Sequence, residues 1–65
     1  MRLTDFWGRM EEHFGAAYAH SVARDQVIGR LGERSVVDAL TAGEDPKQVW
    51  LAVCEHFEIP VAQRH

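Results

Sequence analysis

Residues 45–57, DPKQVWLAVCEHF, contain the best-marked helix start in this chain. Asp45 is a good N-cap, Pro46 stands at the first helical position, where its missing N–H costs nothing, and Gln48 can close a capping box. An apolar stripe follows at helical spacing, with Cys54 on its margin: Val49, Trp50, Val53 and Phe57. Pro60 prevents continuation. The pattern therefore predicts a helix over about 46–57.

The start of the chain, residues 3–14 or LTDFWGRMEEHF, has the same spacing of aromatic, apolar and histidine positions. Few residue patterns place an aromatic core face on a helix, so we interpret the similarity as having arisen separately in two helices and not by duplication. Thr4 is the expected N-cap and Gly15 the terminator of a helix over about 4–14. The two stripes together predict the core: Phe6, Trp7, Met10, Phe14, Val49, Trp50, Val53 and Phe57.

Two further helices are expected between these. Residues 16–31 favour one helix ended by Gly32, although two short helices bent near Arg24 and Asp25 would fit the same mixed apolar pattern. Ser35 can cap a third helix over about 35–42, with Val36, Val37 and Leu40 pointing inward and Gly43 ending it. No segment alternates with period two, so no strand is expected.

The predicted fold is therefore an all-α, compact three- to four-helix domain that ends in a helical hairpin. The chain has 65 residues and a formal net charge of −3, which suits one domain over residues 1–65 with a frayed tail over 58–65. No long stretch lacks charges, so we expect no membrane span. Cys54 is the lone cysteine, which makes a reducing cytoplasm the expected location.

Residues 35–54 have some features of a helix-turn-helix motif, with Ala39, Gly43 and Val49 at its small, turn and buried positions. The would-be recognition helix carries acids and no arginine, however, and a helix in the major groove must tolerate dense phosphates. The charge pattern therefore argues against nucleic-acid binding, which would require one stripe of positive charge built from Arg2, Arg9, Arg24, Arg30 and Arg34.

Metal and catalytic sites are not indicated either. The four histidines (His13, His20, His56 and His65) lack the spacing of zinc ligands. Cys54 has no obvious base or cation beside it in the sequence, and the adjacent Glu11 and Glu12 diverge on a helix. We expect no metal, no cofactor, no small-molecule substrate and no enzymatic activity.

The chain resembles a family of short, about 60-residue actinobacterial proteins of unknown function. The resemblance covers nearly the whole length, and the residues that carry it are Met1-Arg2-Leu3-Thr4-Asp5-Phe6-Trp7, Phe14-Gly15, Tyr18, Ala23-Arg24-Asp25, Ala39-Leu40, Gly43, Asp45-Pro46-Lys47, Val49-Trp50 and Ala52-Val53-Cys54. Val22 stands where the family has tryptophan. Members are often encoded near the gene for recombinase A and its regulator, which implies a link to DNA repair but no site residues.

Surface apolarity is the remaining signal. Leu51 falls on the polar side of its helix, and a thin core with two tryptophans leaves Trp7 or Trp50 partly exposed. The sequence thus predicts a non-catalytic protein-interaction module that uses Leu51, Trp7 and Trp50, with an unidentified protein or a second copy as partner. The alternative is a helix-turn-helix-like nucleic-acid accessory factor.

Overall fold

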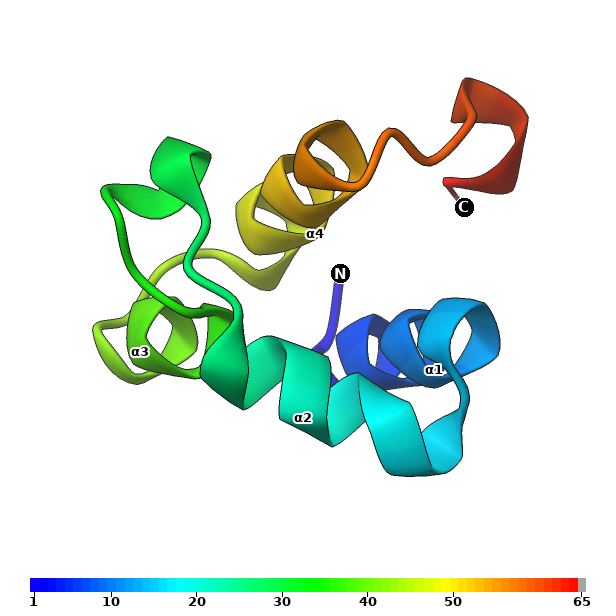
Figure 1. Cartoon of the computed structure of the whole chain (residues 1–65), viewed down its shortest axis with the longest axis horizontal. Helices are drawn as coiled ribbons and strands as arrows, with labels where there is room; N and C mark the ends of the chain where they lie inside the picture. Colours follow the sequence, from blue (N-terminus) through cyan, green and yellow to red (C-terminus); the bar gives the residue numbers. More distant parts are fainter. Residues whose placement is uncertain (65) are drawn as a thin grey trace.

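The computed structural model describes residues 1–64 and confirms an all-α architecture (Figure 1). Four α-helices and two short 3₁₀ helices follow one another: α1 (Leu3–Phe14), α2 (Ala16–Asp25), η1 (Gly29–Leu31), α3 (Val36–Thr41), α4 (Pro46–His56) and η2 (Val61–Gln63). Within this described part of the chain no helix is long and apolar enough to cross a membrane.

Each helix packs mainly against the elements next to it in the sequence. The first and last α-helices, α1 and α4, also contact each other (Figure 1). Helices α3 and α4 form the predicted hairpin, and α4 also packs against η1. The turn between α3 and α4 passes through Gly43 with φ +92°, a conformation that side chains with a Cβ rarely adopt. Gly15 has φ +87° and plays the same part between α1 and α2.

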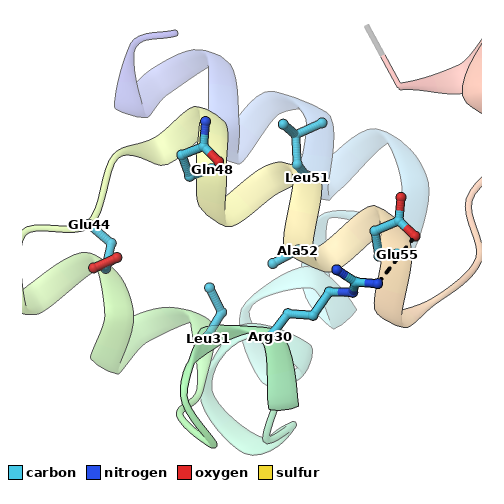
Figure 2. Close-up of a pocket in the computed structure, with 7 residues that line it drawn as sticks. All are labelled: Arg30, Leu31, Glu44, Gln48, Leu51, Ala52 and Glu55. Atoms are coloured by element: carbon cyan, nitrogen blue, oxygen red, sulfur yellow. Dashed lines mark ion pairs between the residues drawn. The ribbon is translucent and has the colours of Figure 1, made fainter.

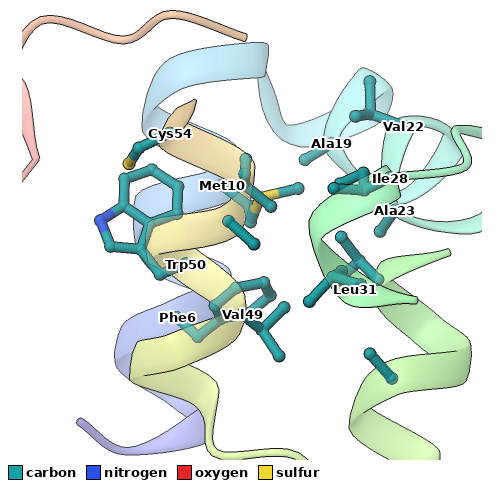
Figure 3. Packing of buried hydrophobic residues seen from close by; sticks show 14 of the residues in the cluster. Phe6, Met10, Ala19, Val22, Ala23, Ile28, Leu31, Val49, Trp50 and Cys54 are labelled. Atoms are coloured by element: carbon teal, nitrogen blue, oxygen red, sulfur yellow. The ribbon is translucent and has the colours of Figure 1, made fainter. Parts of the chain in front are cut away.

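The core lies where α1, α2 and α4 meet (Figure 3). The Phe6 ring packs edge-on against Trp50, with centroids 6.3 Å apart. The predicted core residues Phe6, Met10, Val49, Trp50 and Val53 are all buried. The other three, Trp7, Phe14 and Phe57, are only partly buried and pack against the edge of this core.

The prediction of one helix over 16–31 is wrong, because α2 ends at Asp25. The chain then extends through Gln26 and makes an isolated antiparallel bridge, in which the Ile28 N–H donates to the Arg34 carbonyl at 3.0 Å. A turn of 3₁₀ helix follows, and Gly32 ends it with a positive φ of 74°. This path buries Ile28 in the core and Leu31, as part of η1, against α4, which explains why the apolar residues of 16–31 do not form one stripe.

Two of the three predicted N-caps are confirmed. The Ser35 hydroxyl accepts from the Asp38 N–H at 3.1 Å, and the Asp45 carboxylate accepts from the Lys47 N–H at 3.1 Å. Thr4 is not a cap, since α1 begins one residue earlier and the Asp5 carboxylate accepts from the Arg2 N–H at 3.3 Å. Here an acid inside the first turn supplies the cap that a preceding hydroxyl was expected to supply.

The described residues after α4, 57–64, contact the rest of the chain. Ile59 is buried, and η2 turns the chain so that Gln63 and Arg64 contact α1 and α4. His65 lies outside the described residues.

Candidate interaction surface

Trp50, one of the three predicted surface residues, is a core residue. Its side chain is 1% exposed, and its indole N–H donates to the Arg64 carbonyl at 2.9 Å. Both the apolar ring and its polar tip are therefore satisfied inside the protein, as buried tryptophan requires. Trp50 offers nothing to a partner.

Trp7 lies instead at the edge of an apolar surface built by α1 and α3. We call it the Trp7 surface; it is a shallow depression of about 270 Å³ lined by Leu3, Trp7, Val37, Leu40 and Thr41. Leu3 is 50% exposed, and Val37, which was expected to point inward, is 37% exposed. Val36 takes the inward position and is buried, so its neighbour Val37 must point away from it on the helix.

The Trp7 ring is held in place by its neighbours. The His20 ring stacks on it with centroids 4.6 Å apart and planes 16° apart, and the Phe6 ring meets it edge-on at 5.4 Å. The His20 Nε2 lies 3.3 Å from a Glu11 carboxylate oxygen, which orients the imidazole in turn. A side chain fixed in this way loses little rotamer freedom when a partner binds.

Leu51 belongs to a different hollow, between α4 and η1 (Figure 2). We call it the Leu51 groove; it measures about 510 Å³ and is lined by Arg30, Leu31, Glu44, Gln48, Leu51, Ala52 and Glu55. Leu51 itself is 37% exposed. An Arg30 nitrogen lies 4.0 Å from a Glu55 oxygen across the groove, and Glu44 pairs with Arg34 at 3.6 Å. A single leucine among paired charges is an ordinary surface feature.

The structure therefore separates the three predicted residues. Trp7 and Leu51 line different hollows, and Trp50 is enclosed by the core. The sequence reasoning missed Leu3, Val37 and Leu40 as surface residues. The signal that could have found Val37 is the pair Val36-Val37, because adjacent residues on a helix cannot both face one core.

Three of the five arginines that a positive stripe would need stand beside acidic side chains. Arg24 pairs with Asp25 at 3.2 Å, Arg30 with Glu55 at 4.0 Å and Arg34 with Glu44 at 3.6 Å. The Arg9 guanidinium donates to the Arg64 carbonyl at 3.3 Å. These carboxylates stand beside the guanidinium groups that would have to meet phosphates, and they lower the local positive potential on which nucleic-acid binding depends.

Among residues 1–64, no cluster of three or more histidine, cysteine, aspartate or glutamate side chains has the geometry to hold a metal ion. Cys54 is buried, and burial raises the pKa of its thiol above the usual value, with the Arg64 guanidinium opposing this only in part. That environment favours the neutral thiol, which is the unreactive form.

Comparison of the chain with curated proteins and with solved structures finds no match to either. One family model does match, over residues 1–62, and its description is "Protein of unknown function (DUF3046)". This agrees with the resemblance to a family of about 60-residue proteins of unknown function. With nearly the whole length covered, the chain belongs to the DUF3046 family.

Proposed function

We propose that this chain is a small, non-catalytic protein-interaction module that docks a partner protein on the Trp7 surface. The observation that carries the proposal is the exposure of Leu3 and Val37 beside a partly buried, immobilised tryptophan. Aromatic anchors set in a small apolar hollow are typical of the energetic centre of protein interfaces.

The chemistry of the surface specifies the kind of partner. Its five lining residues include one hydroxyl, that of Thr41, and no charged side chain. A partner would therefore place one or two apolar side chains in the hollow, against Trp7 and Val37. Because the hollow is shallow, the affinity would rest on a few buried contacts around the indole.

The module would work in a reducing cytoplasm, where its unpaired Cys54 stays a thiol. Burial of this thiol and the raised pKa support a packing role for it, in line with a chain that binds and does not catalyse.

Affinity capture from the cells that produce the protein tests the proposal. The bait would be the tagged full chain, the variant Val37→Glu, and the matched control Val27→Glu, which changes an exposed valine outside the Trp7 surface. We expect a partner that is captured by the wild type and by Val27→Glu and reduced at least tenfold by Val37→Glu, because burying an unpaired carboxylate costs at least about 1.4 kcal/mol.

A partner that Val37→Glu captures as well as the wild type does would contradict the proposal. Circular dichroism of both variants checks that the helices persist, so that loss of binding is not loss of folding.

The alternative is a nucleic-acid accessory factor, a role that rests only on the resemblance described above and on the link to DNA repair that it implies. The acidic pairing of Arg24, Arg30 and Arg34 speaks against it. Fluorescence anisotropy with labelled single-stranded and duplex DNA at low salt distinguishes the two. Binding that weakens steeply with salt would favour the alternative, and no binding would favour the protein-interaction module.

A further inference from the structure

The last described residues of the chain, 59–64 or IPVAQR, lie in a groove formed by α1 and α4. We call residues 59–64 the C-terminal segment. Figure 1 shows it leaving the end of α4 and returning toward the C-terminal part of α1. Ile59 is its buried anchor, whereas residues 60–63 are exposed, so polar contacts and not close packing hold most of it.

Three side-chain donors converge on the backbone of this segment. The Trp50 indole N–H donates to the Arg64 carbonyl at 2.9 Å, and the Arg9 guanidinium donates to the same oxygen at 3.3 Å. The His13 Nε2 lies 2.8 Å from the Gln63 carbonyl, which can only accept, so this nitrogen carries the proton. The groove thus binds two consecutive carbonyl groups.

The segment also contributes contacts of its own. The Arg64 side chain donates to a Glu55 carboxylate oxygen at 3.0 Å and to the Ile59 carbonyl at 2.7 Å. A gap of about 360 Å³ remains between it and α1, lined by Glu12, His13, Ala62 and Gln63. The segment is therefore recognised by a set of hydrogen bonds that does not depend on close packing beneath residues 62 and 63.

The connection to α4 is strained. Glu58 has φ +55°, in the left-handed region that residues other than glycine avoid. Glu58 is exposed, and its N–H makes a long hydrogen bond of 3.3 Å to the Glu55 carbonyl, while the Ile59 N–H donates to the Cys54 carbonyl at 2.9 Å. A strained hinge followed by a segment held through its backbone is the combination that favours exchange of the segment between copies.

We propose that the C-terminal segment exchanges between two copies of this chain, so that the α1–α4 groove of one copy binds residues 59–64 of the other. Each groove then makes the same hydrogen bonds as in the monomer, including the one from the Ile59 N–H to the Cys54 carbonyl, which would join the two copies, and the backbone changes direction at Glu58. The ratio of exchanged dimer to monomer depends on the protein concentration, on the effective concentration of the tethered segment and on the strain released at Glu58. The effective concentration of such a segment is on the order of millimolar. This inference is independent of the Trp7 surface.

Disulfide trapping tests which chain fills the groove. Glu12 and Ala62 face the same gap, so a chain with Glu12→Cys is mixed with a mass-tagged chain with Ala62→Cys under oxidising conditions. We expect a covalent heterodimer whose yield rises with concentration from about 0.1 to 1 mM, the range in which a millimolar effective concentration is overcome. Cys54 is buried and remains in every variant.

Two controls give each result a meaning. The double variant in one chain should form its disulfide within the monomer, and Val27→Cys replaces Ala62→Cys in the mixture as an exposed cysteine outside the groove. A heterodimer yield no higher than with Val27→Cys overturns the proposal. Failure of the double variant to close with a bifunctional thiol reagent long enough to span the gap overturns it as well, since the segment would then not occupy the groove.

A matched pair of hinge variants at Glu58 provides a second readout by sedimentation equilibrium. Glu58→Val disfavours the positive φ and should strengthen dimerisation by roughly tenfold. Glu58→Gly removes the strain and should weaken it by a similar factor. Equal dimerisation in the two variants, or a chain that stays monomeric in both at 1 mM, would contradict exchange through this hinge.

Discussion

Replacing Trp50 with phenylalanine should destabilise the protein by about 2–3 kcal/mol, which would be a large share of the stability of so small a domain. The substitution removes the indole hydrogen bond to the Arg64 carbonyl, worth about 1 kcal/mol. It also leaves a cavity where the outer six-membered ring of the indole was buried, worth about 1–2 kcal/mol. No further penalty arises for the carbonyl, because the Arg9 guanidinium still donates to it.

Urea denaturation followed by circular dichroism at 222 nm measures the effect without relying on tryptophan fluorescence. Trp7→Phe is the matched control, because Trp7 is only partly buried and no hydrogen bond of its indole N–H to the protein is seen in residues 1–64. We expect Trp7→Phe to lower the free energy of unfolding by no more than about 1 kcal/mol. Equal losses in the two variants would refute the assignment of Trp50 to the core and Trp7 to the surface.

Three further predictions concern local chemistry. Gly8→Ala, inside α1, should raise the free energy of unfolding by about 0.5–1 kcal/mol, since a Cβ there meets nothing within 4 Å. Gly15→Ala should lower it by about 1–2 kcal/mol, because Gly15 has a φ of +87°. Shifts of the melting temperature in the same direction for the two variants would contradict this. Asp45→Ala should cost about 1 kcal/mol through loss of the cap on the Lys47 N–H, measured by urea denaturation against Glu44→Ala, a neighbour outside the cap; equal costs would argue against the cap. The raised pKa of Cys54 predicts that its thiol reacts slowly with a disulfide reagent in the folded protein, and rapid labelling under native conditions would contradict the burial. It also predicts a free energy of unfolding that falls above about pH 8.5, because the thiol of the unfolded chain loses its proton first. Cys54→Ala should remove that fall.

Much of the fold follows from local chemistry that a sequence displays. Ser35 and Asp45 cap their helices as predicted, because a hydroxyl or carboxylate needs only the adjacent backbone N–H groups to do so. Helical period alone likewise placed Phe6 and Trp50 in one core, and in the structure the two rings pack against each other.

The errors lie where distant parts of the chain decide the outcome. The break after Asp25 depends on the bridge of Ile28 to Arg34 and on the burial of Ile28 beneath other elements, neither of which a propensity scale includes. The placement of residues 59–64 depends on backbone carbonyls as acceptors, and these are the same for every residue type.

The candidate surface was only half predictable for a related reason. The sequence placed both tryptophans on the interaction surface, but only Trp7 is partly exposed, and Trp50 is buried. Which face of α3 turns outward depends on how α3 packs against α2 and α4, so Val37 was placed inside with Val36 although the structure exposes it.

Site-specific photocrosslinking in the cells that produce the protein tests the Trp7 surface most directly. A photoreactive phenylalanine derivative is placed at position 37 and, separately, at the control position 27, both of which are exposed valines. The account predicts one discrete adduct, larger than the chain, from position 37 and none of that mass from position 27. The same adduct from both positions, or an adduct from position 27 alone, would contradict it.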